Sequence, residues 1–193
     1  MGAIDGCYNQ PMGRPSLRET RRRQLASALI RVLATHGQAG VTIAAVAAEA
    51  GVRQGIVHHY FVDKQDLYGA ALDRLVTRFR ERLRDARDDA TGLEAYADAA
   101  LALDSNADVA AARAWVGLFA EALADPMLFQ KLRRLLDTEV VAIQSRAGHR
   151  LSTHDASAVL SFVVGALVFG SFAPRRAAGF AAPSLRRLIG ALA

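Results

Sequence analysis

The segment from Thr42 to Lys64, TIAAVAAEAGVRQGIVHHYFVDK, constrains the fold most, because it has the pattern of two short helices joined by a glycine turn. The Thr42 hydroxyl can cap the first helix, and Gly51 can end it, since glycine tolerates the left-handed backbone that follows many helices. Apolar residues mark the inner sides of the two helices, at positions 43, 46, 47 and 50 and then at 52, 56, 57 and 61. This spacing predicts a helix-turn-helix with one polar side left to solvent.

The polar side of the second helix carries a dense set of hydrogen-bond donors, mainly Arg, Gln, His and Tyr. In a helix-turn-helix this side enters the major groove of DNA, where Arg and Gln read base edges while Thr, Tyr and Lys hold phosphates. An ordinary helical hairpin with a solvated polar face is the alternative interpretation. The residues predicted to contact DNA are Thr42, Arg53, Gln54, His58, His59, Tyr60 and Lys64.

The same motif resembles a known family. AGVRQGIVHHYFVDKQDL is similar to the recognition-helix signature of the TetR family of bacterial transcriptional regulators, and RRRQLASALIRVLATHG is similar to the first helix of that family. Two residues depart from the family pattern. Arg53 stands where a capping serine or threonine is usual, and His58 stands where a tyrosine is common. A fainter resemblance, in ARAWVGLFAEALADPMLFQKLRR (residues 112–134), is to the central helices of the BetI-like branch.

The resemblance implies a dimer that binds a palindromic operator in double-stranded DNA, represses transcription and is released by a small-molecule inducer of unknown identity. The BetI-like segment favours choline or a related quaternary ammonium compound, with hydrophobic drugs and other metabolites left open. A constitutive DNA-binding protein without an inducer is the alternative function. A small-molecule-binding protein or an enzyme is a more remote one.

The positive charge is concentrated at one end of the chain. Residues 1–60 contain seven arginines and three acidic residues, so this part carries +4 of the formal net charge of +5. A basic end on a nearly neutral remainder fits phosphate binding confined to that end, although a solvated charge run is the simpler explanation of the arginines alone. The single cysteine, Cys7, suits the reducing cytoplasm, where we expect the protein to act.

Helical periodicity dominates the remainder, and no segment alternates with period two, so the expected fold class is all-α. We expect a mobile N-terminal arm over residues 1–17, a helix-turn-helix DNA-binding domain over 18–62, and a helical ligand-binding and dimerisation domain over 63–193. A long helix from Lys64 to about Asp88 would link the two domains. Further helices are expected near 92–103, 108–124, 127–147, 154–173 and 184–192.

The segment Ala156–Ala173 has no charged residue and is at the lower length limit for crossing a membrane. A helix that is apolar on all sides can instead be buried in protein, and the small residues in this one would let a partner helix approach closely. We therefore expect a dimer interface here and no membrane association. The residues assigned to that interface are Phe162, Gly165, Ala166, Phe169, Gly170 and Leu188.

Large side chains on the central helices predict an apolar ligand pocket with a few polar groups, although aromatic residues at helical spacing are more often plain core. The expected lining residues are Tyr96, Trp115, Phe119, Met127, Phe129 and Phe162, with Asp104, Glu121 and Arg113 as polar anchors.

Catalytic and metal-binding motifs are not found, so we expect no enzyme activity, no cofactor and no metal. His58 and His59 are adjacent, and neighbours on a helix point about 100° apart, so they do not form a metal-ligand pair. The only local group of Ser, His and Asp, Ser152–Asp155, has the pattern of a helix cap.

Overall fold

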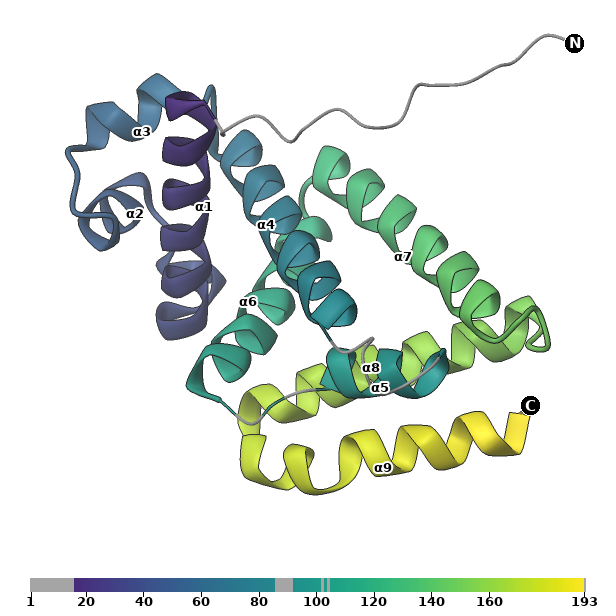
Figure 1. Ribbon diagram of the computed structural model, residues 1–193. Helices are drawn as coiled ribbons and strands as arrows, with labels where there is room; N and C mark the ends of the chain where they lie inside the picture. The colour runs from purple at the N-terminus through teal and green to yellow at the C-terminus, as the bar shows by residue number, and fades with distance from the viewer. Residues whose placement is uncertain (1–15, 86–91, 102, 104, 193) are drawn as a thin grey trace, which may run out of the picture.

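The structure is a computed structural model that describes residues 16–85, 92–101, 103 and 105–192. These residues contain helices and no strand, which confirms the all-α prediction (Figure 1). The elements are α1 (Leu17–His36), the short 3-10 helix η1 (Gln38–Gly40), α2 (Ile43–Glu49), α3 (Gln54–Tyr60), α4 (Lys64–Asp85), α5 (Leu93–Leu101), α6 (Asn106–Ala122), α7 (Pro126–Arg146), α8 (Thr153–Phe172) and α9 (Pro174–Leu192). The arm predicted for residues 1–17 lies outside the described residues except for Ser16, which caps α1, and Leu17, which begins it.

Helices α1 to α3 form a unit at one end of the molecule, hereafter the head (Figure 1). Leu25, Leu29 and Leu33 of α1 are fully buried at the predicted helical spacing. Helices α4 to α9 are hereafter called the body. The apolar core around these leucines continues into α4, α6 and α7 of the body, through residues such as Leu72 and Leu118. The head is therefore packed onto the body as well as joined to it by the chain.

Local signals set the helix-turn-helix as predicted. The Thr42 hydroxyl accepts a hydrogen bond of 3.0 Å from the backbone N–H of Ala45 and caps α2. Gly51, which follows the end of α2, has a φ of 67°, in the left-handed region. Arg53 occupies the N-cap position of α3, where the family usually has serine or threonine. Its side chain makes no capping hydrogen bond to the helix, so α3 has no side-chain N-cap. The cap predicted at Ser152 is also present, with Ser152 accepting from the N–H of Asp155.

The prediction that Ile56 is buried is wrong. Val57 is fully buried and Phe61 nearly so, whereas Ile56 is 38% exposed. Helix α3 has only seven residues and presents a narrow edge to the core, which Val57 occupies. Phe61 lies just beyond the end of α3. The second buried side chain of this segment therefore comes from the residue that follows the helix and not from the helix itself.

The last helix begins ten residues earlier than the sequence predicts, at Pro174 and not near Ser184. Pro183 lies inside it, and the missing N–H leaves the carbonyl of Gly179, four residues earlier, without its helical partner. Both residues are exposed, so water can bind that carbonyl. The inner side of the helix is held by Ala177, Ala181 and Leu185, all fully buried.

Helix α8 is, among the described residues, the helix long and apolar enough to cross a membrane by length and composition. It packs against α5, α6, α7 and α9, so part of its apolar surface is covered within the chain. Ala166 and Gly170 lie on this covered side, and a Cβ added at Gly170 would approach Leu103 to 2.6 Å. Their assignment to a face open to a partner is therefore wrong, because their small size serves packing within the chain.

The opposite side of α8 is open. Gly165 and Phe169, both assigned to the interface from sequence, are exposed there. Phe162 and Leu188 are half-buried and pack at the margin of the body core. The open side forms an apolar patch with α9, whose members are Gly165, Val168, Phe169, Phe172 and Phe180.

Arg22 of α1 connects the head to the start of the body. Its guanidinium donates to Asp66 of α4 at 2.6 Å and to the carbonyl of Tyr60, and it lies 4.2 Å from the centre of the Phe61 ring. The hydrogen bond from Arg22 holds the pKa of Asp66 below its usual value. A carboxylate with a lowered pKa stabilises the fold above its ordinary pKa, and this stabilisation is lost as the pH falls through the lowered value.

We predict that Asp66→Asn lowers the free energy of unfolding at neutral pH by about 1 kcal/mol, the range of a partly exposed charged hydrogen bond. Urea unfolding of both proteins across a pH series measures it. The difference between them should shrink as the pH falls below about 3.9, the ordinary pKa of Asp. Asp73→Asn is the control. It removes the ion pair between Asp73 and Lys131, and because Asp73 is more exposed than Asp66, the free energy of unfolding should fall by less. A difference that does not change with pH would contradict this role for Asp66.

Candidate nucleic-acid interface and ligand cavity

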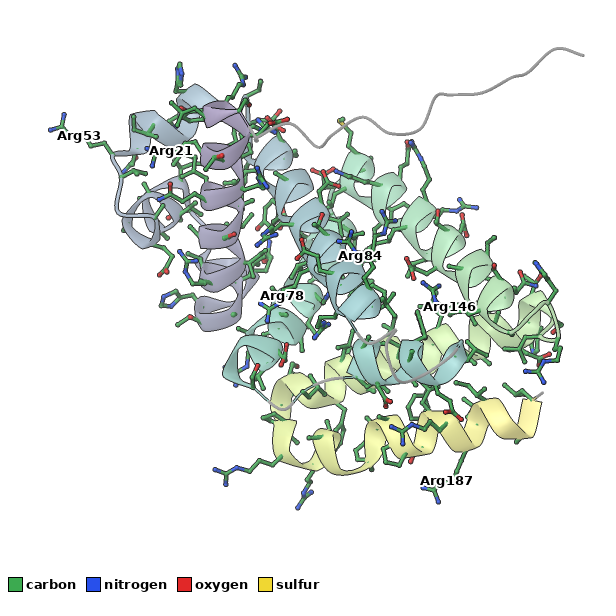
Figure 2. The ribbon with its side chains drawn as sticks, in the orientation of Figure 1. Arg21, Arg53, Arg78, Arg84, Arg146 and Arg187 are labelled. Carbon is green, nitrogen blue, oxygen red and sulfur yellow. The ribbon has the colours of Figure 1, made fainter. Side chains whose placement is uncertain are left out.

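The outer side of α3 is a polar surface open to solvent. Arg53, Gln54, His58 and His59 are all exposed, and Figure 2 shows Arg53 pointing away from the rest of the molecule. Ile56 is exposed on the same short helix. Sequence reasoning missed Ile56 as a surface residue, because an apolar side chain in an amphipathic pattern is normally assigned to the core.

The remaining predicted DNA contacts lie at the edges of this surface. Thr42 is exposed at the start of α2, although its hydroxyl accepts the capping bond described above. Tyr60 is half-buried, and its ring meets that of His59 edge to face at 4.9 Å. Lys64 is half-buried at the start of α4, with its ammonium 5.3 Å from the centre of the Tyr68 ring. The structure therefore brings all seven predicted residues to one end of the molecule, with four of them exposed on or beside α3.

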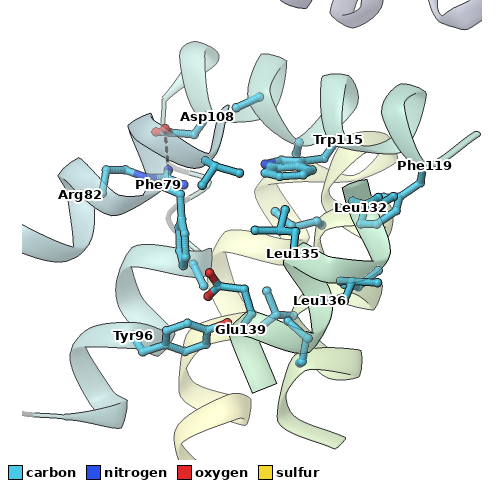
Figure 3. A pocket seen from close by; sticks show the side chains of 18 of the residues that line it. Phe79, Arg82, Tyr96, Asp108, Trp115, Phe119, Leu132, Leu135, Leu136 and Glu139 are labelled. Atoms are coloured by element: carbon cyan, nitrogen blue, oxygen red, sulfur yellow. Dashed lines mark hydrogen bonds and ion pairs between the residues drawn. The ribbon is translucent and has the colours of Figure 1, made fainter. Parts of the chain in front are cut away.

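A cavity of about 70 Å³ lies among the helices of the body and is partly open to solvent. Its walls come from α4, α5, α6, α7 and α8 and are mostly apolar. Tyr96, Trp115 and Phe119 line it, as the sequence predicts, and Phe79 of α4 joins them (Figure 3). The rings of Phe79 and Tyr96 meet edge to face at 5.8 Å, and those of Trp115 and Phe119 lie 6.0 Å apart.

Several predicted pocket residues lie elsewhere. Met127 and Phe129 are exposed at the start of α7, 78% and 46% respectively, because Leu128 between them, 4% exposed, takes the position that faces the core. Phe162 packs beside the body core but does not line the cavity. Arg113 donates to the carbonyl of Ser171, and Glu121 accepts from Gln38, so neither anchors a ligand in the cavity. Asp104 lies outside the described residues.

The charged groups of the cavity are Arg82, Asp108 and Glu139, none of which sequence reasoning identified. Arg82 and Asp108 form an ion pair of 3.0 Å between α4 and α6, and Arg78 also pairs with Asp108. Glu139 has neither an ion pair within 4 Å nor a hydrogen bond from any residue that the structure describes. Figure 3 shows its carboxylate directed toward the space between the Phe79 and Tyr96 rings.

Burial raises the pKa of Glu139, and the more distant charges of Arg146 and Arg80 oppose that effect. A sequence signal for Glu139 exists, because it falls on the apolar stripe of α7 formed by Leu132, Leu135, Leu136 and Ile143. An acidic residue at such a position must be buried at some cost unless it meets a partner. The cavity therefore holds one carboxylate that the described chain leaves without a partner.

Comparison with known proteins gives matches over both parts of the chain. Residues 25–71 match the family described as bacterial regulatory proteins, tetR family. The chain is 29% identical over 164 residues to the HTH-type transcriptional regulator BetI of Stenotrophomonas maltophilia (strain R551-3), an alignment covering 82% of this chain and 83% of that protein. It is 31% identical over 138 residues to BetI of Escherichia coli O45:K1 (strain S88 / ExPEC), covering 67% of this chain and 71% of that protein.

Among solved structures, a transcriptional regulator from Rhodococcus sp. Rha1 has a TM-score of 0.79 and 25% sequence identity, with 89% of this chain and 95% of that chain covered. The likeness therefore includes the body as well as the head. The family match itself begins in α1 and ends in the first part of α4. It spans the helix-turn-helix and the helix that carries it into the body.

Proposed function

This chain belongs to the TetR family of bacterial regulatory proteins, and on that premise we propose that it is a dimeric repressor in the cytoplasm that leaves its operator when a small molecule binds. The observation that carries the proposal is the exposed polar side of α3, presented by a head whose opposite side is sealed to the body. A polar helix side that is fixed in space and free of neighbours is what reading a major groove requires.

Within the head, we assign the contacts with base edges to Arg53 and Gln54 at the start of α3, since the N-terminal residues of a recognition helix contact base edges. Exposed Ile56 fits contact with a thymine methyl group. His58 and His59 border the same surface. Thr42, Tyr60 and Lys64 stand at its edges, where the phosphates of the flanking backbone pass.

The dimer is proposed to form through the apolar patch on α8 and α9. Phe172 is 82% exposed, and Phe169 and Phe180 form an edge-to-face pair at 5.5 Å that is itself 44% and 39% exposed. Contiguous exposed aromatic residues mark interaction surfaces in soluble proteins. A two-fold dimer would place two α3 helices toward successive major grooves, about 34 to 36 Å apart, and so favour a palindromic operator.

The cavity is proposed as the inducer site, and its chemistry favours an organic cation. The unpartnered Glu139 carboxylate supplies negative charge, and the rings of Phe79 and Trp115 line the same space, where the face of an aromatic ring attracts a cation through its quadrupole. Tyr96 also lines the cavity, with the Arg146 guanidinium already 5.5 Å from the centre of its ring. Arg82 is paired with Asp108, which it shares with Arg78. The remaining lining is apolar and suits a hydrocarbon substituent on the ligand.

Ligand binding would change operator affinity only if the ligand prefers the conformation in which the heads lose register with DNA. A coupling of about 1 to 3 kcal/mol would alter operator affinity about 5- to 150-fold. A constitutive DNA-binding protein, in which the cavity has no ligand, is the alternative. It predicts that no compound bound in the cavity changes operator affinity.

Selection of bound fragments from random double-stranded DNA by the purified protein should recover a palindrome. Against that palindrome, Gln54→Ala should relax specificity at one base pair per half-site, at a cost of about 1 to 3 kcal/mol. Lys64→Ala should weaken binding to all sequences alike and reduce the salt dependence by about one unit of slope. Recovery of no sequence at low ionic strength would refute the proposed function.

Phe172→Arg should weaken dimerisation by about tenfold or more, because a charged side chain would replace a buried aromatic anchor at the interface. Sedimentation velocity over a range of protein concentrations measures the change. Leu123→Arg is the matched control, since Leu123 is equally exposed, at 82%, but lies at the α6–α7 corner. Equal dimerisation of both variants and the unchanged protein would place the interface elsewhere.

Benzyltrimethylammonium should bind the protein more tightly than neopentylbenzene, its neutral isostere, and Glu139→Gln should abolish that preference by weakening the cation about tenfold or more. Calorimetry gives the affinities, and Trp115, the single tryptophan of the chain, reports on the cavity by fluorescence. Glu94→Gln, at an exposed position of α5, makes the same charge change away from the cavity. Equal affinity for the two isosteres would exclude a cation site at Glu139.

A further inference from the structure

Helix α6 contacts the cavity on one side and the head on the other. Trp115 and Phe119 are four residues apart and line the cavity. Gly117 and Glu121 are also four residues apart, and both contact the head. Gly117 lies two residues after Trp115, and Glu121 lies two residues after Phe119. Two residues correspond to about 200° around a helix, so the two pairs lie on nearly opposite sides of α6. One helix thus separates the ligand cavity from the DNA-binding unit.

The contact at Glu121 is polar and is shielded from water on the Glu121 side, whereas Gln38 is exposed. Glu121 is only 8% exposed, and its carboxylate accepts a hydrogen bond of 2.5 Å from the side-chain amide of Gln38. Gln38 begins η1, the short element between α1 and α2, four residues before the Thr42 cap. This bond therefore ties the body to the joint from which the helix-turn-helix departs.

A third element meets the same carboxylate. Tyr68 of α4 is 1% exposed, and its hydroxyl has no hydrogen-bond partner of good geometry in the described structure. Burial, and after it the negative charge of Glu121, raise the pKa of Tyr68. Glu121 therefore lies where η1, α4 and α6 come together, and a small movement of its carboxylate toward Tyr68 would supply that hydroxyl with an acceptor.

The contact at Gly117 is close packing. A Cβ added at Gly117 would lie 2.8 Å from the Leu33 side chain, which is itself 1% exposed. Helix α1 consequently rests directly on α6 as well as on α4. A displacement of α6 cannot be absorbed by free space at this point, because protein interiors are close-packed.

We propose that Gln38 and Glu121 are positioning residues that set the orientation of the head on the body through α6, separately from the α4 connection. The proposal rests on the DNA-binding role proposed for the head. The pair touches no DNA and no ligand, and acts by holding the joint before α2 at one place on α6. Because the two heads of a dimer must meet successive grooves, their orientation determines which spacing between operator half-sites is bound best.

The experiment exchanges donor and acceptor. Gln38→Glu alone removes the donor from the buried Glu121 carboxylate and sets a second carboxylate against it. It should weaken operator binding about tenfold or more, since like charges brought together are costly. It should also flatten the preference among operators whose central spacer is lengthened or shortened by one base pair. The double variant Gln38→Glu with Glu121→Gln lets the new amide donate to the new carboxylate. It should restore both affinity and spacing preference at unchanged net charge.

Ala39→Glu is the control for added negative charge, because exposed Ala39 adjoins Gln38 in η1. It should leave the spacing preference intact. Hydrogen exchange of backbone amides in residues 38–46, measured without DNA, should be faster in Gln38→Glu and return to normal in the double variant. The proposal would be overturned if Gln38→Glu changed neither the spacing preference nor the exchange pattern. It would also be overturned if the double variant bound the operator no more tightly than Gln38→Glu alone. A protein that binds no DNA would refute the proposed function, while the exchange measurement would still decide the role of this pair.

Discussion

The continuous apolar core between α1 and the body is the constraint on which the rest of the structure depends. A helix as short as α3 has little stability of its own, since isolated helices of this length are marginal in water. It is held because Val57 and Phe61 join the same core as Leu29, Leu72 and Leu118. Because these two residues hold α3 in place, the residues on its outer side need not pack against the protein and can be polar. The outer side of α3 therefore stays exposed to solvent.

Charged groups complete what the core begins, at places where helices from different parts of the chain meet. Arg22 joins the end of α3 to the first turn of α4, and Arg82 joins α4 to α6 through Asp108. Glu121 joins the body to η1 through Gln38. These contacts are directional, so each of them is made only when the helices that it joins are correctly oriented. Glu139 is the exception, because its carboxylate faces a cavity and not another helix.

Small residues show how far a sequence pattern can mislead. The run from Ala156 to Ala173 is apolar on every side, so periodicity does not tell its inner side from its outer one. Gly165 and Gly170 looked equivalent in the sequence, yet the first is exposed and the second sits against Leu103. The last helix was similarly expected near residues 184–192, whereas α9 begins at Pro174 and continues through Pro183. In each case the neighbours of the helix, which periodicity cannot identify, determined the outcome.

The sequence by itself determined the helices of the head, their caps, the glycine turn and the polar side of α3, because these follow from contacts within a few residues along the chain. It also predicted aromatic residues at the cavity, since Tyr96, Trp115 and Phe119 lie on apolar helix sides. Only the tertiary structure decided that Phe129 and Ile56 are exposed, that Glu139 enters the cavity, and that Glu121 faces the head instead. Those outcomes depend on which helices become neighbours, and that choice is made by packing between residues far apart in the chain.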